Sequence, residues 1–355
     1  MQKIVSRLSS LQIGIIVLLI AVAVLSITAW RLFVPVPRPM EERLLLSVPF
    51  QPGAQGALYA GVSGFVSYSL KTGSTTALSN NLPKGTYAVA LSPDAQLLVV
   101  AAQSLPVSDA STTPNFSLVR VPTLGGEATT LFTSDARLIP GAVSADGSEI
   151  AYVELSPVAM STRPGPKTQP NRSASGTGRA DVYLIPQDSY LSFVGTHEAR
   201  RVAKNAIPLA FSPDGSMLLA LQEGGLIIIT VASGDLQQIQ MPSQVPLISE
   251  DTHVVVAPGG AYMAIFGGQS SQVSVASIDW TGKRLSFAGS VPVAASEAAF
   301  ALSRMMLLEP VENTSVVLHT YSLLSMNGNS TITPIASHVY PIPPYAHILG
   351  WLPFK

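Results

Sequence analysis

A short hairpin motif recurs along this chain and constrains its fold more than any other feature. Three segments place a Ser-[Pro/Ala]-Asp-[Gly/Ala] tetrapeptide between two apolar runs, at residues 88–102, 141–155 and 209–222. Proline presets φ for a β-turn, aspartate caps the turn with its side chain, and glycine accepts the positive φ that follows. Each copy is therefore predicted to be a β-hairpin with a structural aspartate: Asp94, Asp146 and Asp214.

Further hairpins extend the pattern along the chain. Residues 254–266 and 298–308 repeat it more weakly, with Ala257 and Ser303 in the position of the first serine. Most of these hairpins are followed by a second one, in which an alternating strand meets a glycine-containing turn, at residues 64–78, 116–131, 226–239 and 273–285. Two successive hairpins supply four strands, which is the blade of a β-propeller.

The spacing of the turns indicates six blades. The turn positions 92, 144, 212, 257 and 303 are 52, 68, 45 and 46 residues apart, and propeller repeats span about 40–50 residues. Residues 347–353 are typical of an inner strand that runs into another turn at Leu352, whereas the first unit begins near Ala57 with its second strand. We therefore expect an all-β, six-bladed β-propeller over residues 44–355, closed by a C-terminal strand that completes the N-terminal blade.

The repeated Ser-Pro-Asp-Gly turn between apolar strands resembles the TolB-like and WD40-like β-propeller families. The resemblance covers the chain from residue 44 onward, and it is closer to the TolB-like type because the Gly-His and Trp-Asp dipeptides of WD40 repeats are missing. It implies six or seven blades, a central channel and, commonly, protein binding. Since the shared motifs are architectural, the resemblance carries over no functional residue.

An apolar segment precedes the repeats. The run from Leu11 to Trp30 has 20 residues and no charge, and at 1.5 Å per residue it spans a hydrocarbon core of about 30 Å. We expect an uncleaved transmembrane helix over residues 11–30. A cleaved signal peptide and a buried soluble helix are the alternatives, but the Ala-x-Ala sequence at residues 21–23 lies inside the apolar run rather than after it.

The flanks of this segment suggest an orientation. Residues 1–10 form a short basic tail, and residues 31–43 form a spacer in which proline stands at every second position between residues 35 and 39. Three positive groups lie on each side of the span, so the positive-inside rule does not decide. A basic tail before an early apolar run is nevertheless typical of a signal anchor. We expect a single-pass membrane protein with a cytoplasmic N-terminus and an extracytoplasmic propeller.

The longest gap between turns, the 68 residues from position 144 to position 212, contains an insertion at residues 156–180. It is rich in Pro, Gly, Ser and Thr, has no acidic residue, and carries a charge of +4. One interpretation is a disordered, solvated extension of a hairpin. The other is a basic lip that contacts anionic lipid, a glycan or an acidic partner, through the candidate contact residues Arg163, Lys167, Arg172 and Arg179.

Few sequence patterns in the chain indicate catalysis or the binding of a cofactor or metal. It has no cysteine, no G-x-S-x-G nucleophile motif, no P-loop and no dinucleotide fingerprint, and no two of its five histidines lie within five residues of each other. With 20 basic against 21 acidic side chains it lacks the charge of a nucleic-acid binder. No catalytic residue, metal ligand or cofactor is predicted. A propeller can still join distant acids at its channel, such as Asp109, Asp181, Asp188, Asp251 and Asp279.

Three functions remain open. The first is a non-enzymatic, membrane-tethered propeller that binds a protein or glycan outside the cytoplasm, because a rigid scaffold with variable loops suits recognition. The second is a hydrolase or lyase whose site lies at the central channel, where histidines and acids would have to converge. The third is an accessory subunit of a larger membrane complex, which predicts an exposed apolar patch.

Overall fold

The computed structural model describes sixteen segments of the chain. These are residues 41–49, 62–77, 82–83, 85–104, 115–123, 126–155, 189–195, 199–223, 225–246, 248, 252–267, 270–301, 304–312, 315–326, 329–340 and 347–354. Residues 42–352 form one compact unit. The expected transmembrane helix at residues 11–30, the tail, most of the spacer and the insertion lie outside the described residues. Among the described residues, no helix has the length and apolar character needed to cross a bilayer.

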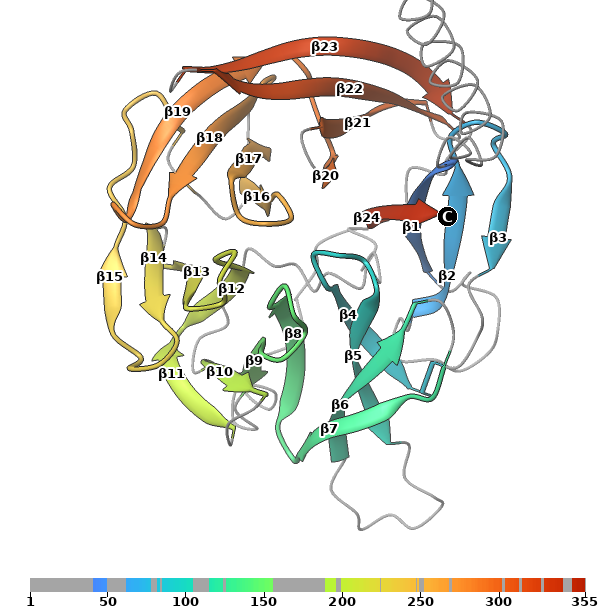
Figure 1. Cartoon of the computed structure of the whole chain (residues 1–355). Coiled ribbons are helices and arrows are strands. Elements are labelled where there is room, and N and C mark those ends of the chain that lie inside the picture. The colour runs from blue at the N-terminus through green and yellow to red at the C-terminus, as the bar shows by residue number, and fades with distance from the viewer. Residues whose placement is uncertain are drawn as a thin grey trace, which may run out of the picture. The chain divides into compact units, whose positions relative to one another are not determined.

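The described strands form six antiparallel sheets of four strands each, which is the architecture of a β-propeller (Figure 1). Blade 1 holds β24 (His347–Phe354), β1 (Glu41–Pro49), β2 (Val62–Ser69) and β3 (Thr75–Ala77). Blade 2 holds β4 (Thr86–Leu91), β5 (Leu97–Ser104), β6 (Asn115–Pro122) and β7 (Thr129–Ser134). Blade 3 holds β8 (Arg137–Val143), β9 (Ile150–Leu155), β10 (Ser189–Val194) and β11 (Arg200–Lys204).

The remaining blades follow the same order from inner to outer strand. Blade 4 holds β12 (Ala206–Phe211), β13 (Met217–Gln222), β14 (Gly225–Thr230) and β15 (Leu236–Gln238). Blade 5 holds β16 (Thr252–Val256), β17 (Tyr262–Gly267), β18 (Val273–Asp279) and β19 (Arg284–Val291). Blade 6 holds β20 (Glu297–Ala301), β21 (Arg304–Glu312), β22 (Ser315–Met326) and β23 (Asn329–Tyr340). The prediction of an all-β fold with six four-stranded units is confirmed.

Blade 1 differs from the sequence expectation in its second strand. That strand was expected near Ala57, but it is β1, which begins at Glu41, inside the stretch assigned to the spacer. β1 pairs with β2 in a regular register from Arg43 opposite Ser69 to Val48 opposite Gly64. Because no Ser-Pro-Asp-Gly turn precedes β1, the repeat pattern did not mark it. On its other side β1 neighbours β24, so this sheet combines strands from both ends of the chain.

One turn geometry recurs between the first and second strands of blades 2 to 5. In each turn, the N–H of the first turn residue donates to the carbonyl of the residue five positions later. The N–H of the residue three positions later donates to the carbonyl of the first turn residue, and all these bonds measure 2.8–2.9 Å. The first turn residues are Ser92, Ser144, Ser212 and Ala257. The residue three positions later has a φ between +58° and +71°, and it is glycine in three copies and Ala95 in one. These turns of adjacent blades lie side by side, since a Cβ on Gly147 would meet Leu97 and one on Gly215 would meet Ser144.

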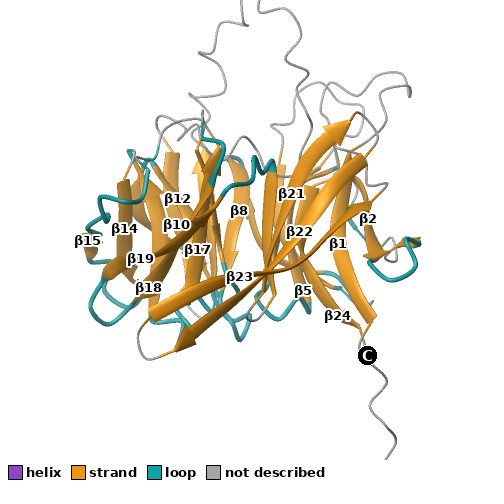
Figure 2. Cartoon of the chain, turned by 90° about the horizontal axis from the view of Figure 1, so that it is seen from above, coloured by secondary structure: helices purple, strands orange, loops and turns teal. Residues whose placement is uncertain are grey.

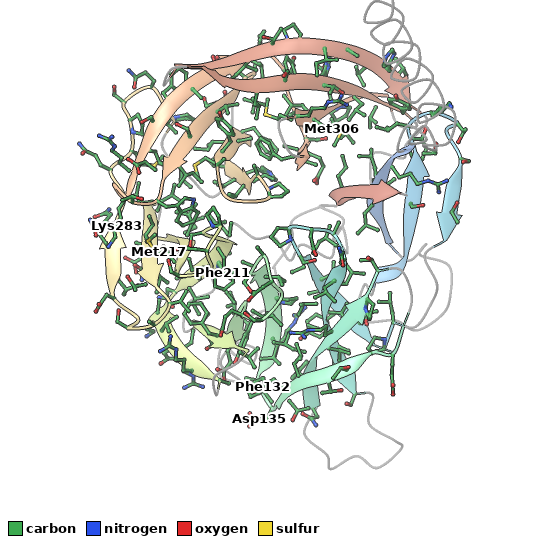
Figure 3. All side chains as sticks on the ribbon, in the orientation of Figure 1. Phe132, Asp135, Phe211, Met217, Lys283 and Met306 are labelled. Carbon is green, nitrogen blue, oxygen red and sulfur yellow. The ribbon has the colours of Figure 1, made fainter. Side chains whose placement is uncertain are left out.

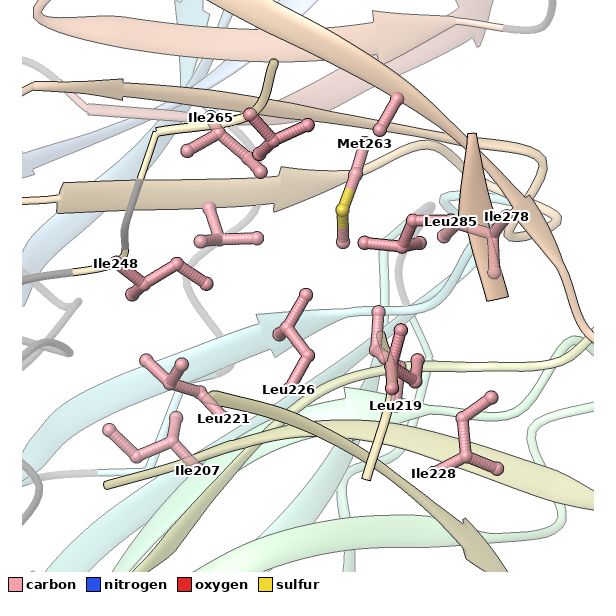
Figure 4. Packing of buried hydrophobic residues seen from close by; sticks show 14 residues of the cluster. Ile207, Leu219, Leu221, Leu226, Ile228, Ile248, Met263, Ile265, Ile278 and Leu285 are labelled. Carbon is pink, nitrogen blue, oxygen red and sulfur yellow. The ribbon is translucent and has the colours of Figure 1, made fainter. Parts of the chain in front are cut away.

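Apolar side chains fill the space between neighbouring blades. Of the buried clusters, one joins blades 4 and 5 through residues such as Leu219, Leu226 and Met263 (Figure 4). The others join blades 1 and 2, 2 and 3, 3 and 4, 5 and 6, and 6 and 1. Phe211 and Met306 belong to two of them, and their side chains are labelled in Figure 3. Each blade therefore buries both faces of its sheet, and blade 6 packs against blade 1.

The hairpin of β22 and β23 is the longest in the described chain. Each strand has 12 residues, whereas the other outer strands have three to eight. Figures 1 and 2 show β23 crossing the outside of blade 6 obliquely. At one end Ile332 packs against the cluster between blades 5 and 6. At the other, Tyr340 packs against the cluster between blades 6 and 1, with its ring edge-on to Tyr68 at 5.9 Å. The hairpin thus contacts both neighbouring blades.

Candidate functional site

The turn aspartates are structural, as predicted. In each of three turns the serine hydroxyl donates to the aspartate carboxylate at 2.6 Å, and the backbone N–H two residues after the aspartate donates to the same carboxylate at 3.0–3.1 Å. Hydrogen bonds to its carboxylate lower the pKa of Asp146 to about 2. The bond from the Ser144 hydroxyl has the largest effect, and the bonds from Ser148 come next. The pKa of Asp214 is lowered by the same kind of bonds. Each of the three carboxylates therefore accepts hydrogen bonds within its own turn.

Most of the acids considered for a channel site lie outside the described residues: Asp109, Asp181, Asp188 and Asp251. Asp279 is described, and it accepts hydrogen bonds from the N–H of Gly282 at 2.8 Å and from Arg284 at 3.0 Å. The hydrogen bond from Gly282 is the largest cause that lowers the pKa of the Asp279 carboxyl, and the bond from Arg284 is the next. Asp279 is thus a turn residue between β18 and β19. In the described part of the chain, no group of three His, Asp or Glu side chains is placed to hold a metal ion.

The predicted lip residues Arg163, Lys167, Arg172 and Arg179 also lie outside the described residues. The chain segment that contains them connects β9 to β10, the second and third strands of blade 3. The loop between β8 and β9, at residues 144–149, lies at one end of the blade 3 sheet. Since successive strands are antiparallel, the segment from β9 to β10 leaves from the opposite end of that sheet.

The outer strand of the same blade is basic. β11 has the sequence RRVAK, and no other outer strand in the described chain carries more than one cation. Arg201 forms two bonds to the Glu154 carboxylate, at 2.8 and 3.1 Å, and lies 4.5 Å from the centre of the Tyr190 ring. Arg200 donates to the carbonyl of Ala232 at 3.1 Å. These contacts hold the two guanidinium groups on opposite faces of the sheet, with Arg201 over β9 and β10 and Arg200 against blade 4.

Charge is unevenly divided between blade 3 and the other blades. Residues 137–204 contain eight Lys and Arg against six Asp and Glu, a net charge of +2. The remaining residues of 44–355 contain seven Lys and Arg against thirteen Asp and Glu, a net charge of −6. The insertion accounts for this excess, because residues 137–155 and 181–204 alone contain four Lys and Arg against six Asp and Glu. Within that range, β11 is the strand in which the positive charges gather. Sequence reasoning missed β11 because a short Arg-Arg run in an exposed strand has no distinctive pattern.

A second polar cluster lies on blade 6. The Nδ1 atom of His319 is 2.9 Å from the Ser337 hydroxyl, and its Nε2 atom is 2.8 Å from a carboxylate oxygen of Glu309. The three side chains come from β22, β23 and β21, which are adjacent strands. The His319 side chain is 17% exposed and that of Glu309 36% exposed. Burial, and then the negative charge of Glu309, raises the pKa of the neighbouring Tyr321.

Two further histidines, His253 and His338, contact aromatic rings. His253 on β16 stacks on Phe266, with ring centres 5.2 Å apart. His338 meets the Tyr340 ring edge-on at 6.3 Å. His197 lies outside the described residues, and His347 begins β24. The pairing of His319 with Glu309 and Ser337 could not be read from sequence because their separations of 10 and 18 residues become contacts only through the strand register.

Comparison with known proteins yields no family. No protein-family model matches the chain, and no curated protein matches it. Among solved structures, the chain is similar to TolB from Acinetobacter baumannii, with a TM-score of 0.47 and 11% identity over 87% of this chain and 67% of that one. It is similar to a structure of the nidogen/laminin complex, with a TM-score of 0.48 and 8% identity over 88% and 97%.

A third similar structure is the Cps50 (Swd1) β-propeller domain from Myceliophteria thermophila. Its TM-score is 0.44, with 11% identity over 80% of this chain and 82% of that one. Likenesses at this level say nothing about binding or catalysis in this chain. The assignment to the β-propeller architecture depends on the six sheets themselves.

Proposed function

We propose that this chain is a membrane-tethered, non-enzymatic β-propeller that binds an acidic protein partner outside the cytoplasm through the basic side of blade 3. This basic side is defined by Arg200, Arg201 and Lys204 of β11. The observation that carries the proposal is the charge difference between residues 137–204, which comprise blade 3 and its insertion, at +2, and the rest of the propeller, at −6. A field of that asymmetry orients an acidic partner towards blade 3 before contact.

The strand that carries the cations also offers backbone groups. β11 is the outermost strand of its sheet, and every second N–H and C=O of an edge strand points away from the sheet. An extended acidic segment can therefore add to this edge, because backbone hydrogen bonds supply affinity and the carboxylates on one face of the segment lie on the same side as Arg201 and Lys204. Arg200 and Arg201 are already held by Ala232 and Glu154, so little side-chain entropy is lost on binding.

The lip residues Arg163, Lys167, Arg172 and Arg179 extend this surface in the proposal. They belong to the connection between β9 and β10 of the same blade. Four further positive charges there raise the local concentration of an acidic partner. We propose the lip as a steering element, so its removal slows association more than it speeds dissociation.

Tethering and ring closure complete the proposal. Residues 11–30 anchor the chain, and β24 closes the propeller by pairing with β1, as the shared sheet supports. The chain enters β1 beside Ser69, next to the turn of residues 70–74. The β9–β10 connection leaves from the other end of its sheet. The start of β1 and the β9–β10 connection are therefore at opposite ends of their own sheets.

The proposal is tested by binding of a labelled peptide of alternating Glu and Val to the full chain in detergent or nanodiscs. Fluorescence anisotropy should show salt-sensitive binding that is lost in the triple variant Arg200→Glu, Arg201→Glu, Lys204→Glu. The matched control reverses Lys283 and Arg284, the cations at the turn before β19 on blade 5, and should bind normally. Equal binding by both variants would exclude blade 3 as the site.

Location is tested separately. A reporter domain fused after Lys355 should be active outside the cytoplasm and protected from labelling inside it. Recovery of the full chain in the membrane fraction after a high-salt wash, and its release when residues 1–40 are deleted, would support the anchor. A cytoplasmic reporter signal would contradict the proposed orientation.

A further inference from the structure

The His319 ring has a hydrogen-bonding arrangement suited to removing a proton from serine. A neutral imidazole has one N–H donor and one lone-pair acceptor. The Glu309 carboxylate only accepts, so the Nε2–H of His319 donates to it at 2.8 Å. The Nδ1 lone pair then accepts from the Ser337 hydroxyl at 2.9 Å. A hydroxyl in contact with a base that is itself oriented by a carboxylate is the general arrangement of an activated nucleophile.

The register of the outer hairpin creates this arrangement. Near the hairpin turn, Met326 is opposite Asn329, and continuing that register would place Ala336 opposite His319. A bulge at Thr320/Tyr321 shifts the pairing by one residue, so Ser337 is opposite His319 instead. Because side chains alternate between faces, this one-residue shift also brings Ser337 to the same face as the histidine.

The surroundings of Ser337 suit an apolar acyl group. Ser337 is exposed on β23, the outermost strand of blade 6. Val339, two residues on and therefore on the same face, is 67% exposed, and Ile335 in the bulge is 51% exposed. These are the two most exposed large apolar side chains in the described chain. A short hydrocarbon chain attached at Ser337 would cover them and remove apolar surface from water.

We propose that Ser337 is an acyl-acceptor site, modified by activated carboxylic esters with His319 as the general base and Glu309 as its positioning residue. The Ser337 oxygen attacks the ester carbonyl while its proton passes to Nδ1 of His319. The bond from the carbonyl carbon to the leaving oxygen then breaks, and the leaving group takes that proton. The products are an O-acyl serine and a free alcohol or phenol, so atoms and charge balance. This site is independent of the proposed partner surface on blade 3.

The experiment treats the full chain with p-nitrophenyl acetate and follows both p-nitrophenol release and the intact mass. We expect one acetyl group per chain, mapped by peptide mass spectrometry to Ser337, and none in Ser337→Ala. The matched control is Ser286→Ala, which removes an exposed serine from β19, the outer strand of blade 5, and should leave acetylation unchanged.

The roles of the other two residues are separated by the acetylation rates of their variants. His319→Gln should slow acetylation by about a hundredfold, which is typical of losing a general base. Glu309→Gln should slow it by about tenfold or more, with Glu309→Asp restoring part of the rate.

Folding is checked in parallel by circular dichroism and thermal unfolding of each variant. A folded His319→Gln variant that is acetylated at Ser337 as fast as the unaltered chain would overturn the proposal. Acetylation of Ser337 no faster than that of Ser286 in the unaltered chain would do so as well. A steady release of p-nitrophenol beyond one equivalent that Ser337→Ala abolishes would support it and would add hydrolysis of the acyl serine.

Discussion

The Tyr87 hydroxyl of blade 2 lies between the backbone N–H and C=O of Leu138 on blade 3. It donates to the Leu138 carbonyl at 2.6 Å and accepts from the Leu138 N–H at 3.1 Å. Leu138 is on β8, the innermost strand of its sheet, and so its backbone has a free edge. One phenol therefore satisfies two backbone groups that the sheet cannot, and it does so across a boundary between blades.

Replacing Tyr87 with phenylalanine should destabilise the propeller. The change keeps the ring, which packs edge-on to Phe116 at 6.0 Å, but leaves both backbone groups of Leu138 without this partner. An unsatisfied buried polar group costs about 1–3 kcal/mol. Urea unfolding should show a lower midpoint with an unchanged slope. The control, Tyr262→Phe, should leave the urea midpoint almost unchanged. An equal decrease in that variant would show that removing any tyrosine hydroxyl has this effect, whatever its contacts.

Stability should also fall at alkaline pH. Burial is the largest cause that raises the pKa of both Tyr87 and Tyr152 to about 12, from 10.0. Between about pH 10 and 12 the folded state keeps phenol protons that the unfolded state has lost, so stability is complete below pH 10 and decreases as pH rises through 12. The thermal midpoint should decrease across that window. Tyr87→Phe should make the decrease shallower, and an unchanged slope would contradict the assignment.

The recurring turn predicts a stabilising change. Ala95 has a φ of +58° at the position where the turns of blades 3, 4 and 5 have glycine. An alanine in this left-handed region is strained by roughly 1 kcal/mol. Ala95→Gly should relieve that strain, although the added chain entropy of the unfolded state offsets part of it. We expect a thermal midpoint that is equal or higher by a few degrees, whereas a clear decrease would show that the Ala95 methyl group contributes more through packing.

The equivalent glycine on blade 5 should not tolerate the reverse change. A Cβ on Gly260 would lie 2.8 Å from the Trp280 ring, whose Nε1 donates to the Gly260 carbonyl at 2.7 Å. Gly260→Ala should cost about 1–3 kcal/mol through overpacking and shift tryptophan fluorescence. Gly259 also has positive φ, at +82°, but its Cβ would meet nothing within 4 Å. Gly259→Ala should therefore cost less and leave the fluorescence unchanged.

Removal of the last strand tests closure. Deleting residues 347–355 removes β24 and exposes the free edge of β1. Ile348, which packs with Leu44 and Met306 between blades 6 and 1, is lost with it. We expect a lower unfolding midpoint and concentration-dependent aggregation, measured by light scattering. A deletion variant that stays monomeric with an unchanged midpoint would show that β24 contributes nothing to closure. Restoring the strand as a separate peptide provides the control.

Sequence alone predicted the parts of this fold that depend on local chemistry. The hairpins around Asp94, Asp146 and Asp214 were predictable because turn residues act within five positions. β1 was not, because its Leu44–Leu46 run lacks a turn signature and its neighbour β24 is some 300 residues away. The cluster of Glu309, His319 and Ser337 depends on a bulge that shifts the register by one residue. Nothing in the intervening residues marks the position of that bulge.

The basic side of blade 3 shows the same division. The charges of the insertion were visible as composition, and they predicted a contact surface without describing its geometry. The placement of Arg200 and Arg201 depends on Ala232, Glu154 and Tyr190, which hold the two side chains on the two faces of the sheet. Charge can be counted in a sequence, whereas the orientation of a guanidinium group depends on neighbours that only the folded chain provides.

The sheet that combines β24 with β1 and β2 has a consequence for biosynthesis. The ribosome makes β1, at residues 41–49, before all the other described strands and β24, at residues 347–354, after them, so β1 must wait for those strands before that neighbour exists. During translation β1 can pair with β2, but its other edge stays exposed to other nascent chains on the same polysome. Chaperones that hold extended segments would thus be needed before β24 is made, and termination of translation before residue 347 would yield a chain whose blade 1 lacks its inner strand and is prone to misassemble.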